Sequence, residues 1–203
     1  MRIAQAAREP LVVSLNSVLA AEGWGQHPRM FMISRFDGKT LGVLDIDLAP
    51  PLWDKRFGYT LLRAFASEYR AGGNGLADKL FRRLKPDKFA GLVFTCETVS
   101  AEDRMRRAFV VLDVDGVVDV HVAELGRVSL WPQGWGDNTL PSVTRIMRDV
   151  ILGLASRHKD LRVNTGMLES LFPGAGGDED CLSSEAREFL RDAAKALCPK
   201  GVK

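Results

Sequence analysis

Five acidic residues occupy positions from which their carboxylates could share one ligand. They fall in three apolar stretches of the chain: Asp45 and Asp47 in the first, Glu97 in the second, and Asp113 and Asp115 in the third. Alternate residues of a β-strand point to the same face of a sheet, so each Asp-x-Asp pair would present its carboxylates together. Neighbouring strands could then hold a divalent cation through oxygen ligands. The solvated face of an antiparallel sheet shows the same alternation, and this simpler interpretation, which we favour, predicts neither a metal nor a cofactor.

The third stretch, Phe109–Val118, reads as an apolar run followed by Asp-x-Asp-Gly. It resembles the first motif of the haloacid-dehalogenase-like phosphohydrolases. That resemblance implies that Asp113 attacks phosphorus, that Asp115 is the general acid, and that magnesium neutralises the phosphate. The later acidic pair of that family should end a buried strand, whereas residues 177–180 lie in a glycine-rich stretch. The residues after Asp115 continue as a strand pattern, so we predict an Asp-Gly β-hairpin with a type I′ turn and no catalytic residue.

A basic group on a short predicted helix is the candidate nucleic-acid surface. Lys79, Arg82 and Arg83 project together within the segment Lys79–Lys88. A face that contacts phosphates would have this composition. The solvated side of an amphipathic helix would have it too, and a formal net charge of only +2 favours that second interpretation. Nucleic acid is therefore an alternative partner and not the expected one.

The segment between residues 127 and 137 contains two tryptophans, Trp131 and Trp135. Exposed tryptophans dominate the binding energy of many protein interfaces. Tryptophan is also highly buried on average, so both rings could instead cover one end of the core. This loop is the strongest binding-site candidate in the sequence.

The C-terminal segment Ser184–Cys198 has an uninterrupted apolar stripe at helical spacing, which includes Phe189, Leu190 and Leu197. A helix of this length is marginal by itself in water, so its stripe must dock on its own domain or on a partner. We predict that all three side chains are largely buried, and we favour a second copy of the chain over the home domain.

The elements that would position these residues alternate irregularly, in the order α-β-β-α-α-β-β-β-α-α. The predicted strands are Met30–Phe36, Leu41–Leu48, Leu92–Thr98, Phe109–Asp113 and Val117–Leu125, with Asp-Gly in the middle of two hairpins. The aromatic spacing of Trp53–Tyr69 predicts one long helix. The fold class is therefore α+β, with an antiparallel sheet of about five strands and helices mainly on one face. Residues 1–172 form the domain, residues 173–182 the linker, and residues 183–203 the C-terminal helix.

Composition indicates an ordinary globular protein, with 46% hydrophobic and 27% charged residues. The three cysteines are far apart and follow no metal-ligand spacing, which favours a reducing compartment and a cytoplasmic location. The sequence contains no run of eighteen apolar residues, so no membrane partner is expected. His121 alternates with valines and is predicted to be a half-exposed strand residue rather than a catalytic base.

Residues 90–125 combine a Cys-Glu strand, the pair Arg106-Arg107, and Val-Leu-Asp-x-Asp-Gly. In this combination they resemble uncharacterised proteins of actinobacteria and their phages, a group that implies no particular function. No coherent catalytic set is present in the sequence. The expected function is that of a non-enzymatic binding or regulatory protein, whose partner is another protein or a second copy of itself. A metal-dependent phosphoryl-transfer enzyme and a nucleic-acid binder are the alternatives.

Overall fold

The computed structural model describes residues 3–36, 40–49, 51–73, 75–99, 103–124, 127–130, 139–172 and 184–197. The helices within these ranges are α1 (Gln5–Ala21), α2 (Thr60–Arg70), α3 (Gly75–Leu80), α4 (Thr139–Arg157), α5 (Thr165–Ser170) and α6 (Ser184–Leu197). The strands are β1 (Arg29–Phe36), β2 (Thr40–Ile46), β3 (Phe89–Val99), β4 (Met105–Asp113), β5 (Val118–Glu124) and β6 (Arg127–Leu130). Within the described ranges, no helix has the length and apolarity needed to cross a membrane.

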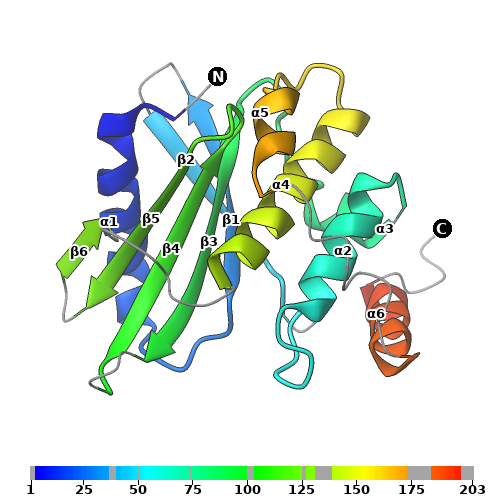
Figure 1. The fold of residues 1–203 in the computed structure, drawn as a ribbon, viewed down its shortest axis with the longest axis horizontal. Coiled ribbons are helices and arrows are strands. Elements are labelled where there is room, and N and C mark those ends of the chain that lie inside the picture. The colour runs from blue at the N-terminus through cyan, green and yellow to red at the C-terminus, as the bar shows by residue number, and fades with distance from the viewer. Residues whose placement is uncertain are drawn as a thin grey trace.

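One six-stranded sheet in the order β2-β1-β3-β4-β5-β6 organises the fold, and each neighbouring pair is antiparallel. Helix α1 lies on one face of the sheet, and the other helices lie on the opposite side (Figure 1). The α+β prediction is confirmed. The strand count rises from five to six because residues 127–130, which the sequence assigns to a loop, pair with β5.

Period-two alternation divides the sheet residues between two hydrophobic cores. Phe94 and Val110 face α2 and α4, where they join the larger cluster of buried residues. Val93 and Phe109 point the other way and pack in a second cluster with α1, which contributes Leu11 and other residues of its apolar stripe. Burial of each such side chain stabilises the fold by about 1.5–3 kcal/mol before the ordering cost. The single helix α1 is thus held on the sheet by hydrophobic contact.

The hairpin predicted at Asp115-Gly116 is present, since Leu112 of β4 pairs with Val118 of β5. The predicted two-residue type I′ turn is wrong. The amide of Gly116 donates to the carbonyl of Asp113 at 3.1 Å, and Gly116, with φ +82°, is the loop's one residue with a positive φ. A type I turn followed by a left-handed glycine is typical of a three-residue hairpin loop. In the other predicted hairpin β1 pairs with β2, and its turn, residues 37–39, lies outside the described residues.

The long helix predicted over Trp53–Tyr69 is also wrong at its start, because α2 begins only at Thr60. The Asp54 side chain accepts a hydrogen bond from the backbone N–H of Arg56 at 2.9 Å, and the Asp54 carbonyl accepts one from Phe57 at 3.0 Å. Such a local side-chain bond offers the backbone an alternative to the helix. Residues 54–57 therefore form turns that carry Phe57 toward α6.

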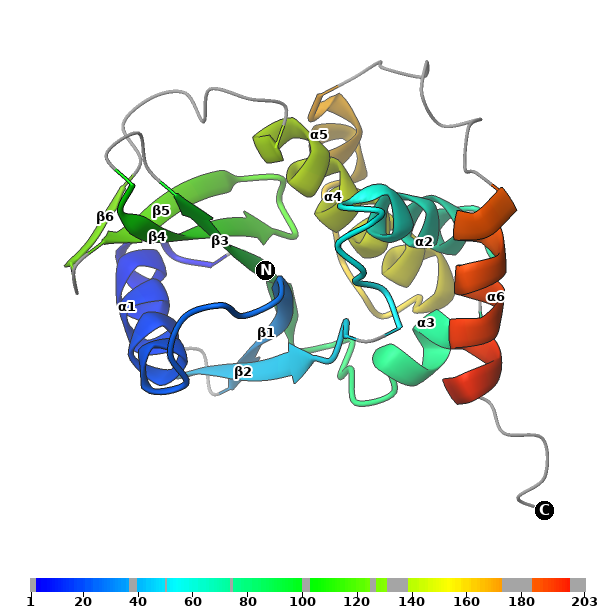
Figure 2. The same ribbon diagram turned by 90° about the horizontal axis from the view of Figure 1, so that it is seen from below.

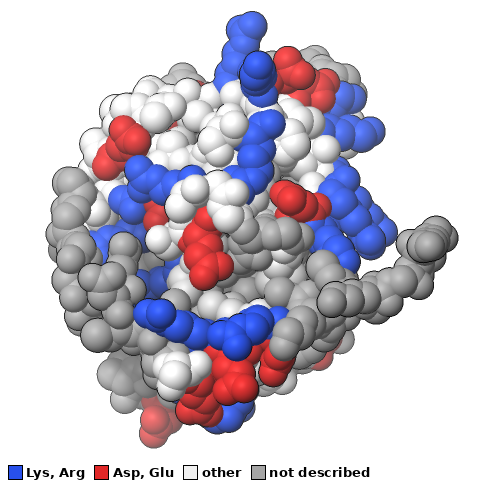
Figure 3. Space-filling view, turned by 90° about the vertical axis from the view of Figure 1, so that its right-hand side faces the viewer, with Lys and Arg blue, Asp and Glu red and all other residues white. Residues whose placement is uncertain are grey.

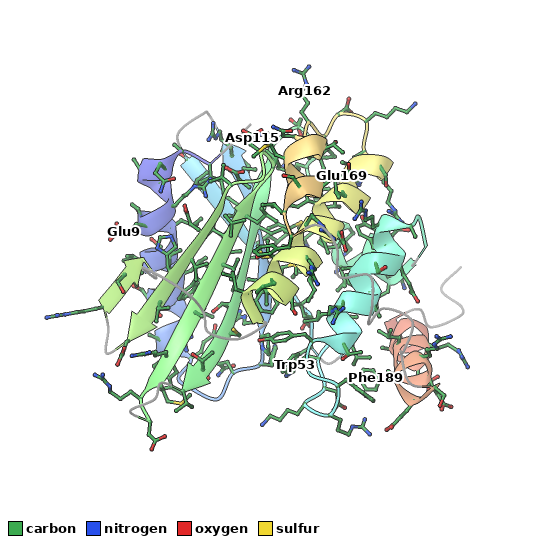
Figure 4. All side chains as sticks on the ribbon, in the orientation of Figure 1. Glu9, Trp53, Asp115, Arg162, Glu169 and Phe189 are labelled. Atoms are coloured by element: carbon green, nitrogen blue, oxygen red, sulfur yellow. The ribbon has the colours of Figure 1, made fainter. Side chains whose placement is uncertain are left out.

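Helix α6 packs on its own domain, against α2 and α3 (Figure 2). Leu190 is 9% exposed, which confirms its predicted burial, and Phe189 is half-buried with its ring centroid 5.6 Å from that of Phe57. The side chain of Leu197 lies outside the described residues. The sequence favoured a second copy as the covering surface, but here the home domain covers the stripe, because the turns before α2 offer it an apolar surface. Figure 4 shows Phe189 on the side of α6 that faces these turns.

Candidate functional site

The carboxylate of Asp113 is enclosed and fully engaged. Its side chain is 0% exposed, and its Oδ2 accepts a charge-assisted hydrogen bond from the guanidinium of Arg8 in α1. Its Oδ1 accepts the backbone N–H groups of Asp115 and Val117 at 3.0 and 2.9 Å. The same guanidinium contacts Asp119 of β5 at 2.9 Å. Asp113 therefore holds the hairpin loop and joins it to α1, and neither oxygen is presented to a substrate.

The strand carboxylates do not converge. Asp45 lies on β2 and Asp113 on β4, with β1 and β3 between them, so roughly 14 Å of sheet separates their strands. Asp115 lies in the hairpin loop at the end of the sheet away from α6 (Figure 4). Among the described residues, no three His, Cys, Asp or Glu side chains are grouped so that they could hold a metal ion. The geometry therefore gives no support to a phosphoryl-transfer centre built on Asp113 and Asp115.

Glu97 belongs to a second buried ion pair, with Arg107 of the neighbouring strand at 2.9 Å. Its other oxygen accepts the backbone N–H groups of Gly25 and Gln26 at 2.6 and 3.1 Å. The guanidinium of Arg107 also lies 4.8 Å from the ring centroid of Trp24. This group fastens the segment after α1 to the sheet, so the role of Glu97 is structural.

His121 is buried rather than half-exposed, with 1% of its surface accessible. It pairs with Phe109 and therefore faces α1. Neither ring nitrogen has a hydrogen-bond partner in the described part of the chain. Burial lowers the pKa of His121 below its ordinary value, and the nearby carboxylates of Asp119 and Glu9 oppose this shift only in part.

The predicted nucleic-acid residues do lie together. Lys79, Arg82 and Arg83 line a pocket of about 450 Å³, but Asp45 and Asp47 at the end of β2 line the same pocket. On the face that carries α2, α3 and α6, Lys and Arg side chains alternate with Asp and Glu (Figure 3). A phosphate backbone favours a concentrated basic face, which this surface does not offer.

A groove lined mainly by apolar side chains separates α1 from β2. It has a volume of about 380 Å³ and is lined by Ala7, Pro10, Leu11, Ser14, Leu15, Val18, Leu41 and Val43. Val18 is 60% exposed and Val43 is 40% exposed. In Figure 2 the twisted sheet curves around α1, with β6 and β2 at its two ends.

Strand β2 forms the outer wall of this groove and is an edge of the sheet. It pairs with β1 along one side only. Outside the sheet ladder, no backbone hydrogen bond between described residues involves residues 41–46. An edge of this kind presents unpaired N–H and C=O groups to any chain that approaches it. Apolar side chains and free backbone groups thus occur side by side.

The predicted tryptophan site cannot be compared with this groove, because Trp131 and Trp135 lie outside the described residues. Comparisons with known protein families, with curated proteins and with solved structures found no match. The resemblance of residues 90–125 to actinobacterial and phage proteins therefore stays a prediction.

The sequence analysis missed Arg8 and the groove. A signal for Arg8 was present, since it lies on the same helical stripe as Leu11 and Leu15, where a charge would be buried. The sequence signal for the groove was weaker: β2 is mainly apolar and contains one acidic residue.

Proposed function

We propose that this chain is a binding protein that captures a segment of another protein chain by strand addition at β2. The observation that carries the proposal is the coincidence of an open edge strand with the apolar α1–β2 groove. In strand addition, main-chain hydrogen bonds supply affinity, and alternate side chains of the added segment enter neighbouring pockets.

The groove fits the alternate side chains of such a segment. Leu41 and Val43 point to the face of β2 that carries α1. A strand added outside β2 would place every second side chain on that same face, above the floor formed by Leu41, Val43 and Leu11. The partner is therefore an extended segment with apolar residues at alternate positions.

The two alternative functions have weaker support. Asp113, the nucleophile of the phosphoryl-transfer hypothesis, is enclosed and paired with Arg8, so a substrate has no access to it. Asp47 in the basic pocket opposes the approach of a phosphate backbone to Arg82 and Arg83. We also propose a cytoplasmic location, a reducing compartment in which the buried free Cys96 would stay a thiol.

A peptide selection tests the proposal. Phage-displayed peptides selected on the dilute wild-type protein should alternate apolar and polar residues. They should lose binding to Val43→Lys, which puts a charge into the groove. Val99→Lys is the matched control, because Val99 is also an exposed strand valine on the α1 face, 59% exposed, but lies away from the groove. Peptides that bind Val43→Lys as well as they bind the wild type would refute strand addition at β2.

A further inference from the structure

The two edges of the sheet differ in how they are protected. Strand β6 has four residues, begins with Arg127, and lies beside α1. Strand β2 has seven residues, contains no proline or lysine, and carries a single charge, Asp45, near its end. Natural edge strands are normally short, charged or covered, which prevents pairing with another chain. β6 follows this rule and β2 does not.

From this contrast we infer that the chain segment that adds to β2 is β2 of a second copy, so that the protein is a homodimer with a continuous twelve-stranded sheet. This inference rests on the proposed function and names its occupant. A two-fold axis perpendicular to the sheet makes the two edge strands antiparallel and keeps both α1 helices on the same face. The same surface is then used by both copies.

The charges at the two ends of β2 favour antiparallel self-pairing. The acidic residues Asp45 and Asp47 lie at the end of the strand, and Arg35 of β1 lies beside its start, opposite Leu41. With the two-fold axis at Val43, the midpoint of Thr40–Ile46, Asp45 of one copy faces Leu41 of the other. Asp45, which pairs with Arg29 of its own copy, then shares a cross-strand row with the second copy's Arg35. A parallel arrangement would set Asp45 of one copy directly opposite Asp45 of the other, and directly opposed like charges are destabilising.

Self-pairing also covers the exposed apolar side chains. Each copy would bring its Leu41 and Val43 to the outer side of the other copy's groove, beside Val18. Val43 would lie opposite its own counterpart, which makes a cross-strand valine pair on the half-covered face. The dimer therefore satisfies the free backbone edge and the groove together.

Sedimentation of the full chain measures the oligomeric state. At about 100 μM, which populates any complex with a micromolar dissociation constant, we expect twice the chain mass of 22.4 kDa. Val43→Lys places two lysines opposite each other at the axis and should raise the dissociation constant at least tenfold. Val99→Lys should leave it unchanged. A monomeric wild type, or a dimer that Val43→Lys does not weaken, overturns the inference.

Disulfide trapping tests the register. Cys181 and Cys198 are replaced by serine, and the buried Cys96 is kept. In this background Val43→Cys should form a covalent dimer on mild oxidation, and Leu41→Cys should crosslink with Asp45→Cys but not with itself. Crosslinking of Val99→Cys instead would refute the β2 interface. If the chain is monomeric yet binds the selected peptides, the second copy is not the occupant, and the proposed strand addition stands. If the chain neither dimerises nor binds the peptides, both the homodimer and strand addition at β2 are refuted.

Discussion

Replacing Arg8 by methionine keeps an unbranched apolar stem and removes the cation that pairs with Asp113. Both side chains are almost fully enclosed, at 2% and 0% exposed. Breaking a buried ion pair from one side costs about 3–5 kcal/mol, because the remaining charge is left without compensation. Asp113 still accepts two backbone hydrogen bonds from its own loop, so we expect the lower part of this range. For a chain of this length, a loss of 3 kcal/mol lowers the melting temperature by roughly 6–12 °C.

A double-mutant cycle separates the ion pair from the packing of Arg8. Asp113→Asn keeps an oxygen that can accept the two loop N–H groups but removes the charge. In the Arg8→Met/Asp113→Asn variant, the side chain at position 113 carries no unpaired charge, whereas Asp119, at 15% exposed, loses its partner in both Arg8→Met variants. The double variant should therefore lose less stability than the sum of the single changes. Urea unfolding followed by circular dichroism gives the four free energies of unfolding. A coupling energy of about 0.5–3 kcal/mol is the range found for residues in direct contact.

Arg56→Met is the matched control, since Arg56 also forms an ion pair with two carboxylates but is 61% exposed. Exposed pairs contribute little because water screens them. If Arg8→Met destabilises the protein no more than Arg56→Met does, or if the double variant shows simple additivity, the assigned role of the Arg8–Asp113 pair is wrong.

Three further perturbations follow from buried contacts. Gly91→Ala would place a Cβ atom 2.4 Å from the carbonyl oxygen of Leu112, so the neighbouring strand must move, and thermal unfolding should show a loss of about 1–3 kcal/mol or more. Burial lowers the pKa of His121 from 6.5. Below pH 6.5 the unfolded chain therefore binds a proton that the folded chain does not, and the free energy of unfolding falls as the pH falls toward the folded-state pKa. His121→Leu should flatten this fall between pH 7.5 and pH 5.5 in urea titrations, and an unchanged slope would contradict the assignment. Deleting residues 181–203 removes the buried Leu190 and should lower the melting temperature, whereas an unchanged value would show that α6 adds nothing to the core.

The strands and the second hairpin could be predicted from the sequence because their signals are local. Alternating apolar residues indicate which face each strand buries, and Asp115-Gly116 marks the turn within a few residues. The C-terminal helix was predictable for the same reason, since its stripe repeats within fourteen residues. The start of α2 was not, because the Asp54 side chain competes with the helix for the backbone while the aromatic spacing continues unchanged.

The ion pair of Arg8 and Asp113 joins residues 105 positions apart, so no local pattern connects them. Both residues nevertheless occupy apolar faces, Arg8 on the stripe of α1 and Asp113 at the end of a buried strand. Two opposite charges on faces that are otherwise apolar are expected to meet, since neither tolerates burial alone. Once the topology is known, Arg8 and Asp113 can be matched as partners. The first carboxylate of Asp-x-Asp-Gly, which resembles a catalytic residue in the sequence, is therefore structural.

The open edge at β2 depends on strand order, which is a property of the whole sheet. The composition of β2 can be read from the sequence: seven residues with one charge and no proline. Its exposure arises because β1 uses its second side to pair with β3 from the middle of the chain, which leaves β2 with one neighbour. At the other end of the sheet, β6 is short and lies beside α1, so a single helix cannot also cover β2. In the isolated chain, the uncovered edge leaves backbone groups of β2 unpaired and Val43 exposed, and both are unfavourable. Pairing with a second chain would satisfy the backbone groups and cover the valine in one contact.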